Sequence, residues 1–86
     1  MAYTPSIPPL DEQALRRRIG SNLRLFRAAR SLSLKQASTL AAIHWRHWQK
    51  IEAAEVNLPL RTLARVARAV NVDVTELLRD PQKRLN

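Results

Sequence analysis

Residues 33–51 read SLKQASTLAAIHWRHWQKI, and this stretch decides the fold. Ser33 is a good N-cap and Gln36, three residues later, completes the pattern of a capping box, so a helix is expected over residues 34–41. Two residues then form a tight connection, and a second helix is expected from residue 45 to about residue 54. The stretch therefore predicts two short helices joined by a tight turn.

The sequence on either side predicts three further helices. Over residues 11–30, apolar residues recur at spacings of four, four and three, which places them on one helical face. Gly20 lies in this run and costs about 1 kcal/mol relative to Ala, so the helix is expected to begin or bend there. The other two helices are expected over residues 60–70 and, after the cap Asp73, up to about residue 80. The residues expected to point inward are Leu15, Ile19, Leu23, Phe26, Ala37, Leu40, Trp48, Ile51, Leu60, Leu63, Ala67 and Val70.

The chain of 86 residues is long enough for one small domain. Residues 1–12 contain three prolines without apolar periodicity, so we expect a flexible N-terminal arm there. Residues 13–80 should form the folded domain, and residues 81–86 a polar tail. Because no strand pattern or internal repeat is found, the predicted fold is all-α with five helices.

Positive charge is concentrated in the segment that forms the first three predicted helices. The chain has 15 Lys and Arg against seven Asp and Glu, a formal net charge of +8. Between Gln13 and Ile51 there are nine basic residues and no acidic one. Because these positive charges repel one another, a polyanionic partner is the natural reason for the block. The alternative is a cationic face that is only solvated.

The composition argues against several functions. The chain has no Cys and a single Gly, which leaves no disulfide, no Cys-based metal site and no Gly-rich phosphate loop. Neither a Cys nucleophile nor paired carboxylates in cleft positions are recognised, so we expect no enzymatic activity. His44 and His47 have a spacing that metals use, but a third ligand is missing, and no metal or other cofactor is expected.

The sequence also favours a location in the cytoplasm. The first residues lack the basic and apolar regions of a signal peptide, and no apolar run is long enough to span a membrane. Residues 15–30 are basic on one side and apolar on the other, as in helices that bind membrane surfaces, but so small a domain needs that apolar face for its core. We therefore expect a cytoplasmic, nucleoid-associated protein without a membrane partner.

Two short helices with a tight turn, set in an acid-free segment, are typical of a helix-turn-helix. The second helix of such a motif enters the major groove of DNA. Helical spacing places Trp48 and Ile51 on the core side of this helix. The residues that then face outward, and that we expect to contact bases, are Trp45, Arg46, Gln49 and Lys50.

Arg46 is the strongest candidate among them, because a guanidinium can bond both O6 and N7 of guanine, while Gln49 suits adenine. Trp45 has two interpretations: it packs on a thymine methyl or a sugar, or it covers core or subunit surface.

The order and spacing of these residues resemble the lambda-repressor/Cro (Xre) family of DNA-binding domains over roughly residues 19–79. The matching positions are Ile19-Gly20, Leu23, Phe26-Arg27, Ser33, Ile43, Ile51-Glu52, Asn57, the segment 60–67, Asn71-Val72-Asp73 and Leu77-Leu78. Leu34 departs from the pattern, since the family often has a phosphate-binding Gln there. Ala42 and Ala54 stand where Gly is usual, which implies mild strain or longer helices, because Gly adopts positive φ without a Cβ clash.

The resemblance implies roles for further residues. Arg27 and Glu52 correspond to a buried ion pair that joins the first and third helices. Trp45, Arg46 and Lys50 correspond to base-reading positions. The residues expected to hold DNA phosphates are Ser33, Lys35, Gln36, Thr39, His44, His47, Asn57 and Arg61. Arg65 and Arg68 are interpreted as a solvated stripe.

The predicted function is a sequence-specific, double-stranded DNA-binding transcriptional regulator, and we expect a repressor because no separate activating or effector domain is recognised. Such modules usually bind palindromic sites as dimers. We expect a homodimer through the last helix, with Val74, Leu77, Leu78 and also Leu85 at the interface. The alternative is an antitoxin or regulator-antagonist that acts mainly by binding a protein partner through the same fold.

Overall fold

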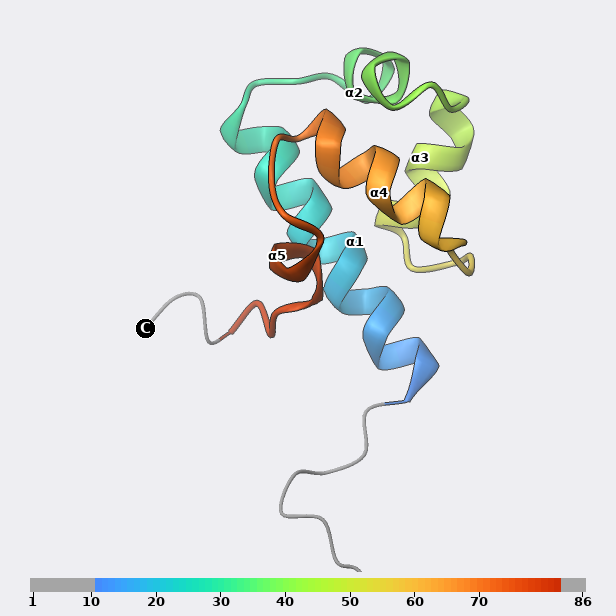
Figure 1. Cartoon of the computed structure of the whole chain (residues 1–86), viewed down its shortest axis with the longest axis vertical. Coiled ribbons are helices and arrows are strands. Elements are labelled where there is room, and N and C mark those ends of the chain that lie inside the picture. The colour runs from blue at the N-terminus through green and yellow to red at the C-terminus, as the bar shows by residue number, and fades with distance from the viewer. Residues whose placement is uncertain (1–10, 83–86) are drawn as a thin grey trace, which may run out of the picture.

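The computed structural model describes residues 11–82, and in this range the chain forms five helices and no strand (Figure 1). They are α1 (Glu12–Ala29), α2 (Leu34–Ala41), α3 (Trp45–Glu52), α4 (Leu60–Ala69) and α5 (Val74–Leu78). α1 packs against α3 and α5, whereas α2 packs against α3 and α4. The predicted all-α fold, with a helix-turn-helix made by the second and third helices, is confirmed.

The predicted capping box opens α2. The Ser33 hydroxyl oxygen accepts a hydrogen bond from the Gln36 backbone N–H at 3.0 Å, and the Gln36 side-chain oxygen accepts one from the Ser33 N–H at 2.8 Å. Both bonds satisfy N–H groups that a helix N-terminus otherwise leaves without partners. Asp73 caps α5 in a simpler way, by accepting from the Thr75 N–H at 2.9 Å. α3 ends at Glu52 and α5 at Leu78, each about two residues earlier than expected.

α1 runs without interruption through Gly20, so of the two expectations for this position the helix start is wrong. Gly20 is buried where α1 crosses the end of α3. A Cβ atom there would lie 2.6 Å from the carbonyl oxygen of Glu52 and 2.8 Å from that of Ile51. The missing side chain therefore serves the close approach of two helices.

The domain begins slightly earlier than expected. Asp11 caps α1 by accepting a hydrogen bond from the Ala14 N–H at 2.7 Å, and Glu12 is the first helical residue. The first residue of α1 and its cap therefore lie within the last two residues of the expected arm. The rest of the arm, and Leu85 in the tail, lie outside the described residues.

The core combines residues from all five helices. Most of the predicted positions are buried, but Leu40 is 63% and Leu60 82% exposed, so their predicted inward orientation is wrong. The buried hydrophobic residues are Ala37 and Ala41 on α2, and Leu63, Val66 and Ala67 on α4. The buried core consists of Ile19, Leu23, Ala37, Ala41, Trp48, Ile51, Leu63, Val66, Ala67, Val70 and Leu77.

Leu77 corrects a second expectation. It is fully buried within the monomer, so it is not available at a dimer interface. Asn22, also fully buried, fixes this end of the chain: its amide nitrogen donates to the carbonyl oxygens of Leu77 at 2.9 Å and Arg79 at 2.8 Å. These bonds satisfy carbonyls that the end of a helix leaves without partners. They draw α5 onto α1 and turn Leu77 into the core, while Val74 and Leu78 are half-buried.

Ala42 and Ala54 adopt left-handed backbone conformations, with φ of 57° and 62°. The turns after α2 and α3 therefore keep the left-handed geometry that Gly adopts freely. Of the two expectations for these alanines, mild strain or longer helices, the structure shows the strained backbone. A non-Gly residue in this region costs about 1–2 kcal/mol.

We predict that Ala54→Gly raises the free energy of unfolding by about 0.5–1 kcal/mol, because the relief of strain exceeds the added freedom of the unfolded chain. The neighbouring Ala53 is the matched control, since it has φ −81° and ψ −1° in the right-handed region. There Gly should lower the stability by about 0.5–1 kcal/mol. Urea unfolding followed by far-UV circular dichroism measures both changes. A loss of stability in both variants would contradict the strain.

Candidate nucleic-acid interface

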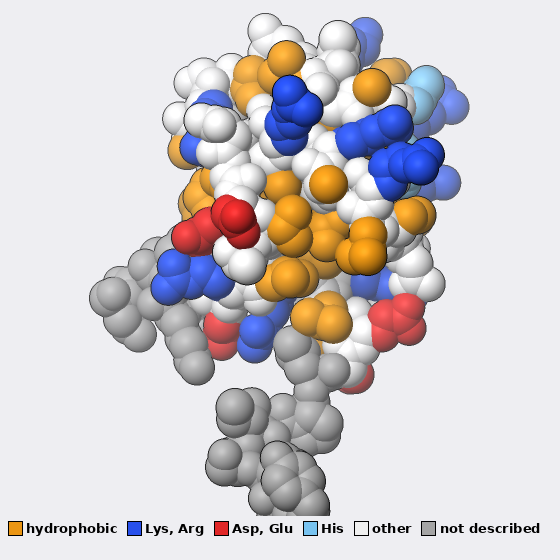
Figure 2. Space-filling view, in the orientation of Figure 1, with side chains coloured by type: hydrophobic (Ala, Val, Ile, Leu, Met, Phe, Trp, Pro, Cys, Tyr) orange, Lys and Arg blue, Asp and Glu red, His pale blue; other side chains and the backbone are white. Residues whose placement is uncertain are grey.

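α3 has one buried and one exposed side. Trp48, Ile51 and Glu52 are buried, and Arg46, Gln49 and Lys50 are exposed on the opposite side. We call Trp45, Arg46, Gln49 and Lys50 the outer face of α3. In Figure 2, Lys, Arg and His side chains gather at the upper right edge of the molecule, where Figure 1 places α3, and the visible acidic side chains lie lower. The candidate base-reading residues thus share one accessible surface.

A shallow groove runs along the C-terminal part of this outer face. It is lined by Arg46, Gln49, Lys50, Ala53 and Glu55. Glu55 is an acidic residue that the sequence analysis did not connect with the site. It reaches the groove because the chain reverses at Ala54, and no ion pair links it to a described Arg or Lys. A carboxylate there can accept a hydrogen bond from N4 of cytosine.

His44 holds the start of α3. Its Nδ1 accepts a hydrogen bond from the Arg46 backbone N–H at 3.0 Å, so His44 is the N-cap. Because Nδ1 accepts this hydrogen bond, Nε2 of the exposed His44 ring is left as the donor. Trp45 is half-buried; its ring stacks on His44 with centroids 5.7 Å apart, and the guanidinium carbon of Arg46 lies 5.3 Å from its centroid.

The candidate phosphate contacts surround this helix. Lys35 and Arg61 are exposed, and neither forms an ion pair with an acidic residue in the range 11–82. His47 is half-buried on α3. Ser33 and Gln36 are exposed but already cap α2, and the Thr39 hydroxyl donates to the carbonyl of Lys35 at 2.8 Å. The cations and His44 therefore have the more available donors.

Asn57 is engaged by a residue that the sequence analysis did not single out as its partner. The Nε of Arg16 donates to the Asn57 side-chain oxygen at 2.8 Å, and a second guanidinium nitrogen donates to the same oxygen. Glu12 pairs with Arg16 at 2.9 Å, and Gln13 donates to the carbonyl of Ala54. The N-terminal turns of α1 thus pin the loop after α3, and only the Asn57 NH₂ group is left to donate to a phosphate.

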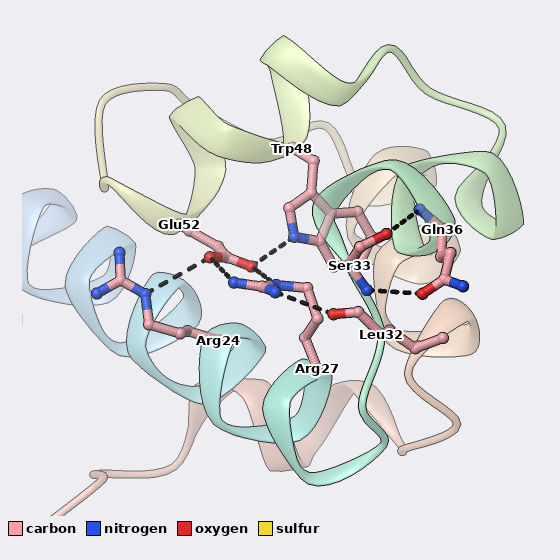
Figure 3. Close-up of polar contacts among 7 residues, drawn as sticks. All are labelled: Arg24, Arg27, Leu32, Ser33, Gln36, Trp48 and Glu52. Atoms are coloured by element: carbon pink, nitrogen blue, oxygen red, sulfur yellow. Dashed lines mark hydrogen bonds and ion pairs between the residues drawn. The ribbon is translucent and has the colours of Figure 1, made fainter.

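Glu52 joins α1 to α3 (Figure 3). Arg27 donates to both carboxylate oxygens, through Nε at 2.6 Å and a terminal nitrogen at 3.0 Å. The indole N–H of Trp48 donates to the same carboxylate at 2.6 Å. Arg27 also donates to the carbonyl of Leu32, in the connection between α1 and α2, and Arg24 lies 3.5 Å from the carboxylate. The ion pair implied by the resemblance is therefore present.

The described residues contain no group of three His, Asp or Glu side chains that would hold a metal ion. None of the helices in residues 11–82 is long and apolar enough to cross a bilayer.

A family model for the helix-turn-helix domain matches residues 18–79. The chain belongs to the helix-turn-helix domain family. A hypothetical transcription factor from Neisseria, NHTF, is 30% identical with a TM-score of 0.79, and the match covers 96% of this chain and 94% of that one. The clp gene regulator ClgR from Corynebacterium glutamicum is 25% identical with a TM-score of 0.70, and the match covers 83% and 87% of the two chains.

A third solved structure shares the fold. The restriction-modification controller protein C.AhdI from Aeromonas hydrophila is 24% identical with a TM-score of 0.69, and the match covers 72% of this chain and 94% of that one. A comparison with curated proteins found no match. This helix-turn-helix protein therefore has the fold of DNA-binding transcription regulators of the Xre type.

The buried carboxyl group of Glu52 has a shifted pKa, which ties the stability of the domain to pH. Burial raises the pKa of the carboxyl group, but the hydrogen bonds from Arg27 and Trp48 and the charges of Arg27 and Arg24 outweigh it, so the pKa is lowered overall. The same Arg27–Glu52 hydrogen bond raises the pKa of Arg27, because it favours the charged guanidinium. A lowered carboxyl pKa stabilises the fold above the unfolded value of about 4.3, and this stabilisation is lost as the pH falls through the folded pKa.

We predict that Glu52→Ala lowers the free energy of unfolding by about 3–5 kcal/mol, because it leaves the Arg27 charge and the Trp48 N–H without their partner. Arg24→Ala is the control, since that side chain is 66% exposed and its loss should cost at most about 1 kcal/mol. Urea unfolding at pH 7 measures both, and equal effects of the two variants would contradict the role of the pair. A second comparison uses Glu52→Gln and the wild type between pH 7 and pH 3. The stability of Glu52→Gln should fall less steeply with decreasing pH, because Gln has no carboxylate to protonate.

Proposed function

We propose that this protein is a transcriptional repressor in the cytoplasm, associated with the nucleoid, that binds a specific double-stranded DNA sequence. In this proposal α3 lies in the major groove, and two copies bind the halves of a palindromic operator. A dimer bound over a promoter keeps other proteins from the same DNA, which is why repression is the effect that we expect.

The exposure of the outer face of α3 carries the proposal. A major groove about 12 Å wide admits an α-helix, and the groove edges of the bases offer hydrogen-bonding groups. Arg46 and Lys50 supply donors for guanine, and Gln49 suits adenine. Glu55 adds a hydrogen-bond acceptor in the groove on the protein surface that Arg46, Gln49 and Lys50 also line. The buried side of α3, in contrast, is used entirely by the core and the Glu52 contacts.

Phosphate contacts would orient the helix in the groove. We assign this role first to Lys35, His44 and Arg61, whose donors are the more available, and next to the half-buried His47. A smaller part is assigned to Ser33, Gln36, Thr39 and Asn57, because protein hydrogen bonds already engage their side chains. Such contacts fix the register on the duplex and carry no sequence information.

The dimer follows from the size of one module. A single module of this kind buries about 600–1,000 Å², whereas a dimer doubles the contact and matches a palindrome. Val74 and Leu78 of α5 are half-buried and apolar, and Figure 2 shows hydrophobic side chains gathered in the middle of the face on which α4 and α5 lie. We assign the dimer interface to Val74 and Leu78, without Leu77.

A protein partner is the second candidate. The observation that favours it is Leu40, which is 63% exposed beside a mainly apolar groove lined by Leu32, Lys35, Gln36 and Thr39. The contacts of Trp45 with His44 and Arg46 weaken it, because they give that aromatic side chain a role within the protein. If selection from random duplexes yields no preferred sequence, so that all duplexes bind with equal affinity, this candidate is favoured.

We predict that Arg46→Ala lowers discrimination between the preferred and a random duplex by about 1–3 kcal/mol. The preferred duplex is obtained by selection from a random pool, and fluorescence anisotropy over a salt series measures both affinities. Six to ten phosphate contacts predict a fall in affinity of about 10³–10⁵-fold between 50 and 200 mM salt.

Lys35→Ala is the matched control for Arg46→Ala. As a phosphate contact, it should weaken binding to both duplexes alike and reduce the salt slope by about one. An equal loss on both duplexes with Arg46→Ala would show that Arg46 contacts only phosphate.

We also predict that Val74→Lys shifts sedimentation toward the monomer and weakens binding to the palindrome, because it places a charge in an apolar interface. Thr75→Lys, at the exposed neighbouring position, should do neither. Thermal melts of both variants check that the fold is retained. A wild-type monomer at all concentrations, with and without operator DNA, would contradict the dimer.

A further inference from the structure

Three consecutive residues at the start of α3 hold one another in place. His44 bonds the backbone N–H of Arg46 through Nδ1 at 3.0 Å and stacks on the ring of Trp45, with the two ring planes 27° apart. The guanidinium carbon of Arg46 lies 5.3 Å from the Trp45 ring centroid, within the range of a cation–π contact. We call this group the His44–Trp45–Arg46 stack. Each of its members contacts the other two.

The stack leaves the hydrogen-bonding edge of Arg46 accessible. Arg46 is exposed, and no carboxylate in residues 11–82 forms an ion pair with it. A guanidinium carries five N–H donors in its plane, and the Arg46 side chain donates none of them to a described residue, since its contact with Trp45 is made through the guanidinium carbon at 5.3 Å from the ring centroid. Trp45 therefore limits the positions that Arg46 samples without taking up its donors.

Binding of guanine by Arg46 would also determine which group of the DNA lies against the face of the guanidinium that is turned away from Trp45. When the edge bonds O6 and N7 of guanine, the guanidinium lies close to the guanine plane. Its open face then looks toward the neighbouring base pair, about 3.4 Å along the helix axis. A guanidinium face has no donor to offer, so an apolar group fits best against it. The apolar group that bases present in the major groove is the C5-methyl of thymine.

We propose that the His44–Trp45–Arg46 stack reads a two-base element: a guanine bound by the edge of Arg46, and an adjacent thymine whose methyl group lies against the open face of the guanidinium. In this arrangement Trp45 is a positioning residue that acts through Arg46 and is not itself a base contact. The inference rests on the proposed function, because the stack reads bases only if α3 enters the major groove.

The first test is a selection from duplexes with a randomised centre about two DNA turns long, which holds both half-sites. The expected result is a guanine flanked by a thymine at the same place in each half-site. Replacing that thymine by uracil in one half-site then removes a single methyl group, and should lower affinity about 4-fold, the equivalent of one buried methyl-sized group. In Arg46→Ala the uracil effect should disappear, because the guanidinium that meets the methyl group is gone.

A double-mutant cycle tests the positioning role. Trp45→Ala should lower the preference for the selected guanine about 2–5-fold, as expected for an exposed cation–π contact. In the Arg46→Ala background it should have no further effect. Gln49→Ala is the matched control, since its effect should add to that of Trp45→Ala. Trp45→Phe, with a smaller ring, should fall between wild type and Ala, and it keeps the test valid if melting shows that Trp45→Ala weakens the fold.

The outcomes separate the two proposals. If the selection yields no preferred sequence, the proposed function itself fails, and this inference fails with it. If a sequence is selected but thymine and uracil bind equally, or if the effects of Trp45→Ala and Arg46→Ala simply add, the repressor proposal stands and the two-base element is overturned.

Discussion

The buried carboxylate of Glu52 is the contact on which the orientation of α3 depends. α3 has eight residues, and isolated helices shorter than about 12–15 residues are marginal in water, so its contacts with the rest of the domain keep it helical. A buried carboxylate is tolerated only where donors replace its lost water. Arg27 donates two hydrogen bonds to the carboxylate and Trp48 donates one. Together these bonds restrict the placement of α3 on α1.

A steric constraint acts at the same place as this attraction. Gly20 and Arg27 are seven residues apart, so they lie on the same side of α1, two turns from each other. Gly20 lets α1 approach the last carbonyls of α3, and Arg27 then reaches the Glu52 carboxylate. A side chain at residue 20 would displace the end of α3 and lengthen the hydrogen bonds of the pair. The one Gly of the chain and its buried ion pair therefore enforce the same geometry.

The sequence predicted what depends on local patterns. Capping of α2 involves residues three apart, and apolar spacing identifies a helical face, so helix positions and the exposed side of α3 were predictable. Spacing does not say how much of a face a neighbouring helix covers, which is why Leu40 and Leu60 are exposed against expectation. The burial of Leu77 depends on Asn22, 55 residues away, and no local pattern signals such a bond. The stacking of Trp45 and the position of Glu55 likewise depend on side-chain and loop geometry.

Different residues of α3 therefore meet different demands. Trp48, Ile51 and Glu52 are committed to the core, and a change there alters the fold before it alters binding. Arg46, Gln49 and Lys50 are exposed and make no contact on which the core depends, so under the proposed function their replacement would alter DNA binding at little cost in stability. His44, the exposed N-cap residue before α3, serves both the fold and the candidate site, because the same ring caps α3 and stacks on the Trp45 side chain. Through His44 the placement of the Trp45 and Arg46 side chains is tied to the start of the helix itself.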